Sequence, residues 1–201
     1  TVMLQPDGKV LIGGDFASYN GYNRSRFARL NSDGSLDQDF DIGTGADLVV
    51  NAIALQPDGR VVVVGDFAHF NGAPLRGIAR LNADGNIDDS FNPGVGFNDS
   101  VRLVGVQEDG RILVGGFFTE FNGVVRNRVA RLMPDGSLDG SFDVGAGANG
   151  SVYSMAVQSD GKILVGGSFS TFNNLNRSGI VRLNTDGSVD TGINFGTGAN
   201  G

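Results

Sequence analysis

Several residue types are absent or rare in this chain. Its 201 residues include no cysteine, no tryptophan, one histidine and five prolines. The absence of cysteine excludes disulfides, zinc–thiolate sites and thiol catalysis. Glutamate and lysine, which favour helices, occur only as Glu108, Glu120, Lys9 and Lys162. Their scarcity argues against a helix-rich protein.

Long hydrophobic runs and a basic charge are also missing. No apolar run approaches the roughly 18 residues of a membrane span, so we expect no membrane insertion. The net charge of −7 lacks the basic footprint of a nucleic-acid-binding protein, so we expect no nucleic-acid partner. The first residues lack the basic and apolar regions of a targeting signal.

Glycine is abundant, with 33 residues, and much of it lies in a repeat. The motif recurs every 51 residues as Gln5-Pro-Asp-Gly8, Gln56-Pro-Asp-Gly59, Gln107-Glu-Asp-Gly110 and Gln158-Ser-Asp-Gly161. A fixed period of this length is typical of repeat architectures. We divide the chain into units 1–48, 49–99, 100–150 and 151–201. The first unit begins inside its first strand.

Each unit reads as four short strands, named A to D here. In the last unit they cover 151–158, 162–169, 177–183 and 188 onward, with Gly, Asn and Asp between them. One four-stranded antiparallel sheet per unit is the spacing of a propeller blade. We therefore predict an all-β fold of four β-propeller blades, forming one propeller or part of a larger one. A β-solenoid is the alternative.

Turn chemistry predicts the strand register. A three-residue hairpin loop suits Pro-Asp-Gly and pairs Leu4 with Val10. The same geometry between strands C and D places an arginine opposite an aspartate in every unit. These predicted structural pairs are Arg29 with Asp37, Arg80 with Asp88, Arg131 with Asp139 and Arg182 with Asp190. Strand B is continuously apolar, as in 61–64, which indicates burial on both faces.

These spaced features resemble a known family. Gln56-Pro-Asp-Gly59, Phe70-Asn-Gly72 and Ala79-Arg-Leu81, with their counterparts in all units, are similar to the bacterial delta-60 repeat, a β-propeller family without an assigned function. The fourth unit departs from the pattern at Asn174 and Ile193. The resemblance implies a propeller fold and a secreted or cell-surface location, and it supplies no catalytic residues.

The long B–C and D–A loops lie on one rim, opposite the tight Asp-Gly turns. Binding residues concentrate on loops held by a rigid scaffold, so we expect a binding site on this loop rim. The candidates are Tyr19, Asn20, Tyr22, His69, Phe70, Asn71, Phe121, Asn122, Phe172, Asn173 and Leu175. The alternative is structural: the recurring aromatic residue plugs the gap between blades, and the Asn bonds the loop backbone. Positions such as Tyr22 and Leu175, which vary between units, suggest a partner-facing surface.

Catalytic and metal-binding patterns are weak. His69 is the single histidine and has no equivalent in other units, which favours an exposed loop residue over a general base. No nucleophile-elbow motif is present. Carboxylates are nearly all Asp in turns. We therefore predict no enzyme and no cofactor. Calcium remains open because Asp37, Asp39 and Asp41 alternate as its oxygen ligands can.

The functional hypothesis is a non-catalytic scaffold or adhesion module of an extracellular or cell-surface protein, which binds protein or glycan through the loop rim. A glycan-active hydrolase or lyase is one alternative, and a purely structural spacer in a surface filament is another. Further blades of a longer chain, or a second copy, are the other expected partners.

Overall fold

The computed structural model describes residues 1–199, and the regular structure in that range is entirely β-strand. Each unit forms a three-stranded antiparallel sheet in the order A, B, C. Strand A is Val2–Leu4 (β1), Val50–Leu55 (β6), Val101–Val106 (β11) and Ser151–Val157 (β16). Strand B is Val10–Gly13 (β2), Val61–Gly65 (β7), Ile112–Gly116 (β12) and Ile163–Ser168 (β17). Strand C is Phe27–Leu30 (β5), Ile78–Leu81 (β10), Val129–Leu132 (β15) and Ile180–Leu183 (β20).

The B–C connection is itself a small hairpin, rather than an irregular loop. Its strands are Ser18–Tyr19 (β3) and Tyr22–Asn23 (β4), His69–Phe70 (β8) and Ala73–Pro74 (β9), Glu120–Phe121 (β13) and Val124–Val125 (β14), and Thr171–Phe172 (β18) and Leu175–Asn176 (β19). The turn residues Asn20 and Gly21 have φ of 47° and 82°, as a two-residue type I′ turn requires. In the fourth unit Asn174 replaces this glycine at φ 60°, because Asn tolerates the left-handed region.

The predicted fourth strand is only one bridge long. Strand D pairs through Leu30–Leu36 in the first unit and through the equivalent residues elsewhere, so each sheet has three full strands, not four. The cause is the aspartate after the bridge. Asp37 accepts a hydrogen bond at 3.2 Å from the backbone N–H of Asp39, and this Asx-turn bends the chain away from the sheet.

The predicted turn register is confirmed. Leu4 pairs with Val10, and the N–H of Gln5 donates to the carbonyl oxygen of Lys9 at 2.8 Å. At the C–D turn, the N–H of Asp37 donates to the carbonyl oxygen of Arg29 at 2.9 Å. The A–B and C–D turns therefore share one rim, and the B–C and D–A connections share the other.

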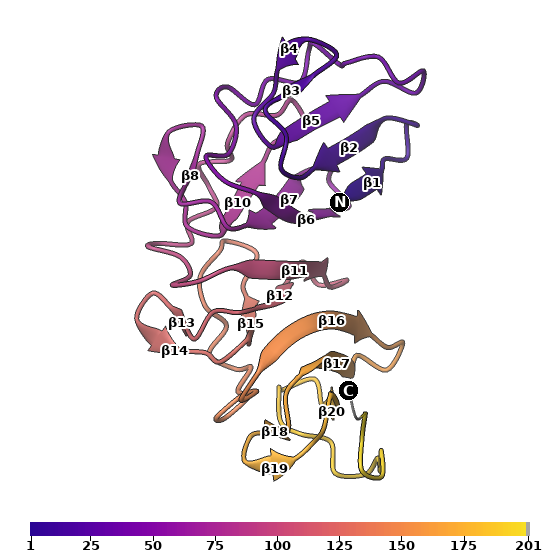
Figure 1. Cartoon of the computed structure of the whole chain (residues 1–201), viewed down its shortest axis with the longest axis vertical. Coiled ribbons are helices and arrows are strands. Elements are labelled where there is room, and N and C mark those ends of the chain that lie inside the picture. The colour runs from indigo at the N-terminus through magenta and orange to yellow at the C-terminus, as the bar shows by residue number, and fades with distance from the viewer. Residues whose placement is uncertain (200–201) are drawn as a thin grey trace.

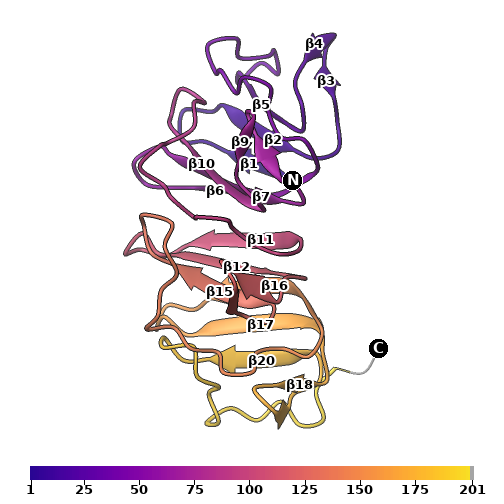
Figure 2. The ribbon, with the colours of Figure 1, turned by 90° about the vertical axis from the view of Figure 1, so that its left-hand side faces the viewer.

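The four sheets stack face to face in chain order (Figures 1 and 2), from the first unit in indigo to the fourth in yellow. An apolar cluster fills each of the three spaces between neighbouring sheets. Val61 and Val63 of β7 pack toward the first unit, while Val62 and Val64 pack toward the third. All four are fully buried, as the continuously apolar pattern predicts. The first and fourth sheets lie at opposite ends of the stack.

Candidate functional site

A β-bulge interrupts strand A near its start. The pairing of β6 with β7 shifts between Val50 and Ala52, and β11 and β16 shift at the equivalent place. The extra residue is therefore Asn51, Arg102 or Tyr153. A bulge bends its strand and changes the direction of a side chain, and bulges are common beside functional sites.

A glycine at the end of strand B makes room for this bulge. A Cβ on Gly65 would lie 2.1 Å from the carbonyl oxygen of Val49, and a Cβ on Gly167 would lie 2.1 Å from that of Ser151. At Gly14, in the first unit, the nearest atom is 3.7 Å away. The glycine in each later unit is therefore required by close backbone approach at the bulge.

The bulge residues differ chemically between units that otherwise repeat. The second unit has an amide, the third a guanidinium and the fourth a phenol at this one position. The residue after the strand B glycine varies too, as Asp66, Phe117 and Ser168. A repeated framework that presents different side chains at its rim is the arrangement expected of a binding site on a rigid scaffold.

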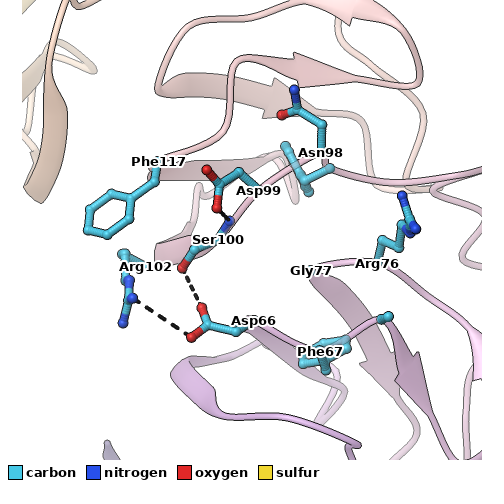
Figure 3. A pocket seen from close by; sticks show the side chains of 12 residues that line it. Asp66, Phe67, Arg76, Gly77, Asn98, Asp99, Ser100, Arg102 and Phe117 are labelled. Atoms are coloured by element: carbon cyan, nitrogen blue, oxygen red, sulfur yellow. Dashed lines mark hydrogen bonds and ion pairs between the residues drawn. The ribbon is translucent and has the colours of Figure 1, made fainter.

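These side chains form one connected group, the bulge cluster, which comprises Asn51, Asp66, Ser100, Arg102, Phe117 and Tyr153. Asp66 accepts hydrogen bonds from the Ser100 hydroxyl and, at 2.7 Å, from the Asn51 amide. Arg102 Nη1 donates to Asn51 Oδ1 at 3.0 Å, and Nη2 lies 3.7 Å from Asp66 Oδ2. Figure 3 shows Arg102 and Ser100 both directed at Asp66. The second and third units thus contribute to one polar network.

An aromatic pair continues the bulge cluster. The Arg102 guanidinium lies 4.7 Å from the centre of the Phe117 ring, within the range of a cation–π interaction. Phe117 meets Tyr153 edge to face, with centroids 5.8 Å apart. Tyr153 is 54% exposed. The cluster therefore runs from a carboxylate through a guanidinium to an exposed aromatic ring.

A cavity of about 400 Å³ adjoins the bulge cluster on the loop rim between the second and third units. Besides Asp66, Arg102 and Phe117, its lining includes Arg76 and Asp99 (Figure 3). The side chains of Asp66 and Arg102 are 29% and 37% exposed. Solvent molecules and ligands thus have access to both charges.

The predicted Arg/Asp pairs are all present on the opposite rim. Nitrogen–oxygen distances are 2.7 Å for Arg29–Asp37, Arg80–Asp88, Arg131–Asp139 and Arg182–Asp190. A second cation contacts each aspartate from the position just before strand B, namely Lys9, Arg60, Arg111 or Lys162. Burial opposes ionisation of Asp139, but hydrogen bonds from Ser141 and Arg131 outweigh it and lower its pKa to about 2. These contacts join the aspartate after the strand D bridge to strand C and to the start of strand B in the same unit.

The aromatic candidates of the loop rim are core residues. Phe70, Phe121 and Phe172 are fully buried between units, so they cannot contact a ligand, and the prediction that they bind one is corrected. Tyr19 is half-buried, and its hydroxyl donates to the carbonyl oxygen of Gly34 at 2.8 Å. The large rings fill the space between sheets because the B–C hairpin folds back over the core.

The asparagine candidates connect neighbouring units. Oδ1 of Asn71 accepts from the N–H of Thr44 at 3.0 Å, and Asn122 and Asn173 accept likewise from the preceding D–A link. Asn20 has no preceding unit among the described residues and is exposed. The hydrogen bonds of the three later asparagines favour the structural alternative.

Three candidates are exposed but separate. Tyr22, His69 and Leu175 lie on different two-stranded hairpins. His69 Nδ1 lies 2.9 Å from Asp47 Oδ2. Asn98, the equivalent of Asp47, makes a matching contact with its own hairpin, where its Oδ1 accepts from the backbone of Glu120 at 3.0 Å. The backbone bond from the hairpin to this residue is repeated between units, and the His69 ring adds a side-chain contact to Asp47 because the equivalent of His69 in the third unit is Glu120.

The aspartates considered as calcium ligands contact other groups of the protein. Asp37 contacts Arg29 and Lys9, and Asp41 accepts from the N–H of Gly43 at 2.8 Å. Over residues 1–199, no three His, Cys, Asp or Glu side chains are grouped as metal ligands would be. Calcium, left open by the sequence, is tested by titrating calcium into chelator-treated protein.

Sequence reasoning missed the bulge cluster, although a signal was present. The strand A positions of Asn51, Arg102 and Tyr153 vary in chemistry between units, but we considered such variation only in the B–C loops. Tyr153 also lies in a stretch that alternates like an ordinary strand. The bulge that changes its direction has no sequence motif of its own.

The stacked antiparallel sheets, each with sequential A–B–C strands and a bridge to D, define the class: this is a β-propeller repeat protein. A family model described as "Domain of unknown function (DUF5122) beta-propeller" matches residues 5–40, 56–91, 107–142 and 158–192, more than half of the chain. The chain belongs to this family. Residues 41–55, 92–106 and 143–157, which contain the bulges, lie between the matched segments.

No curated protein matches the sequence. Two solved structures share the fold. One is the extracellular domain of a B. thetaiotaomicron protein provisionally assigned as a one-component system, with TM-score 0.52, 16% identity, and coverage of 92% of this chain and 21% of that one. The other is provisionally assigned as a gluconolactonase, with TM-score 0.51, 16% identity, and coverage of 94% and 60%. The present chain thus spans only part of either protein, and at this identity the likeness shows the fold alone.

Within the described residues, no helix has the length and apolar character needed to cross a membrane.

Proposed function

We propose that this propeller is a non-catalytic binding module of an extracellular or cell-surface protein and that it binds glycan at the bulge cluster. The observation that carries the proposal is a series of contacting side chains on one rim, which comprises Asp66, Asn51, Arg102, Phe117 and the exposed Tyr153. The location draws support from the extracellular neighbour.

The chemistry of the bulge cluster suits a sugar. A sugar ring has a face of C–H groups, against which an exposed aromatic ring such as Tyr153 can pack. The hydroxyl groups at its edge need hydrogen-bond donors and acceptors together. Asp66 accepts, Arg102 donates and Asn51 does both. Because these side chains already bond one another, little side-chain entropy is lost on binding.

The hydrolase alternative is favoured by one observation. Asp66 and Asp99 line the same cavity, and glycosidases use a pair of carboxylates. Against it, Asp66 is already bonded to Ser100 and Asn51, and Asp99 accepts from the N–H of Ser100 at 2.7 Å. Carboxylates that already accept hydrogen bonds from the protein are better suited to positioning a ligand than to transferring a proton.

A glycan array followed by calorimetry tests the proposal. We expect Tyr153→Ala and Arg102→Ala to weaken binding of the array hit at least tenfold. Leu175→Ala, an exposed apolar position on a hairpin, is the matched control and leaves binding unchanged. Loss of binding in the control, or unchanged binding in Tyr153→Ala, would contradict the bulge-cluster site.

Two further readouts separate the alternatives. Mass spectrometry of the incubated hit detects cleavage; turnover that Asp99→Asn abolishes would establish the hydrolase. No binding to any glycan on the array, combined with no binding on a protein array, would leave the spacer hypothesis.

A further inference from the structure

One arginine of the cavity beside the bulge cluster has no counterpart in the other units. Arg76, two residues before β10, lines this cavity of about 400 Å³. The equivalent residues are Ser25, Asn127 and Ser178. The cavity lies between the second and third units, and each of these units has a neighbouring sheet on both sides (Figures 1 and 2). The Arg76 charge therefore distinguishes this interface from the other two.

The backbone of Arg76 is held in place while its side chain is unpaired. The carbonyl oxygen of Arg76 accepts a hydrogen bond from the N–H of Phe97 at 3.2 Å, and a Cβ on Gly96 would lie 2.3 Å from the same oxygen. Arg76 is exposed, and over residues 1–199 its guanidinium makes no hydrogen bond or ion pair. Its N–H donors and its full charge are thus available to a ligand.

The other charges of the cavity leave one anion unpaired as well. Arg102 and Asp66 partly offset one another, with Nη2 3.7 Å from Oδ2. Asp99 is exposed; its carboxylate accepts from the N–H of Ser100 at 2.7 Å and has no cationic partner in the described part of the chain. In Figure 3, Arg76 and Arg102 lie on opposite sides of the view, with Asp66 and Asp99 between them. The cavity therefore offers a free cation and a free anion together.

We propose that the ligand is a glycan that contains a uronic acid residue and that Arg76 binds its carboxylate; this inference rests on the glycan-binding function proposed above. A guanidinium binds a carboxylate through paired, parallel N–H···O bonds. An ionised carboxylate such as that of Asp99 only accepts hydrogen bonds, so it suits the hydroxyls of the same sugar. A uronic acid carries both groups on one ring, as the cavity requires.

The acidic surroundings select against a densely charged glycan. The chain has a net charge of −7, and Asp66 and Asp99 line the same cavity. Charges act over roughly 8 Å at physiological ionic strength, so an anion on every sugar would meet these two carboxylates. We therefore expect an isolated uronic acid in an otherwise neutral glycan.

Calorimetry with matched oligosaccharides tests the proposal. The probes are an oligosaccharide with a single glucuronic acid residue and the same oligosaccharide after chemical reduction of its carboxyl to an alcohol. We expect the reduction to weaken binding to the unchanged chain at least tenfold. Equal affinity for the two probes would overturn the assignment of the carboxylate.

One substitution with a matched control tests the arginine. Arg76→Ser introduces the residue that the first and fourth units have at this position, so the fold should tolerate it. We expect it to weaken binding of the acidic probe at least tenfold and to change binding of the reduced probe less than twofold. Arg126→Ser removes the same charge from a residue of the loop rim outside the cavity and leaves both affinities unchanged. Equal losses in the two variants would overturn the role of Arg76.

The outcomes separate this inference from the proposed function. Binding of neutral glycans that depends on Tyr153, with no preference for the acidic probe, would overturn the uronic acid and leave the glycan-binding module standing. Stronger binding of a fully sulfated glycan than of the acidic probe would also overturn it. No binding of any glycan would contradict the proposed function itself, and this inference with it. Melting temperatures verify that each variant is folded.

Discussion

Arg131 should contribute far more to stability than its counterpart Arg182, although the two occupy the same position in successive units. Arg131 bonds Asp139 at 2.7 Å and the carbonyl oxygen of Thr185 in the next unit at 2.7 Å. Its guanidinium also lies 4.6 Å from the ring centre of Phe142. Replacing Arg131 with Met removes all three contacts and leaves a buried carboxylate.

The magnitude follows from what Asp139 retains. Removing one partner of a buried ion pair costs roughly 3–5 kcal/mol. Asp139 is 4% exposed but keeps Arg111 at 3.1 Å, which places the expected loss near the lower limit, about 3 kcal/mol. For a chain of this size that corresponds to a melting temperature lower by about 6–12 °C.

Arg182→Met is the matched control. Arg182 is 20% exposed, whereas Arg131 is 8% exposed. The fourth-unit equivalent of Phe142 is Ile193, which has no aromatic ring for the Arg182 guanidinium to contact. We expect less than half of the loss seen for Arg131→Met. The assay is urea unfolding monitored by circular dichroism, with thermal melts in parallel. Equal losses in the two variants would refute the cross-unit role of the arginine.

Three other expectations concern acid stability, the bulge and the links between units. Asp139 has a pKa of about 2, below the ordinary 3.8. The stability that its ionised carboxylate contributes is therefore complete above about pH 4 and is lost as the pH falls toward about 2. Between these pH values the free energy of unfolding of Asp139→Asn should fall less than that of the unchanged chain, as measured by urea titrations. Gly65→Ala forces a backbone clash and should cost more than about 2 kcal/mol, whereas Gly14→Ala, whose Cβ would meet its nearest atom at 3.7 Å, should cost less than about 1 kcal/mol. Similar melting temperatures would contradict this. Asn122→Ala should destabilise more than Asn20→Ala in thermal melts, because only Asn122 holds the preceding unit.

Repeated local chemistry made much of the fold predictable. The Pro-Asp-Gly turns gave the register of β1 and β2, and the same spacing placed Arg29 against Asp37. The apolar run 61–64 predicted a strand covered on both faces. These features depend on residues close in sequence and recur in each unit.

The missed features depend on competition between local and longer-range contacts. Strand D is shortened because the carboxylate of Asp37 bonds a backbone N–H two residues on instead of leaving it for the sheet. The Asn20-Gly21 hairpin has a strong turn signal, but its strands are only two residues long. The rings of Phe70 and Phe121 look like rim residues until the hairpin folds back over the core.

The sequence placed the expected binding site on the same rim as the bulge cluster but among other residues. Its members come from three units, and their approach depends on the stacking of sheets as well as on a bulge that no local motif marks. Comparing Asn51, Arg102 and Tyr153 position by position between units is the signal that would have found them.

The most direct test of the account is to make the bulges identical. The double variant Arg102→Asn, Tyr153→Asn gives the second, third and fourth units the same bulge residue, and both side chains are partly exposed, so the fold should tolerate the change. We predict a melting temperature close to that of the unchanged chain and no calorimetric binding of the glycan selected on the array. Retained affinity in the folded double variant would contradict the claim that differences between units at the bulge create the binding site.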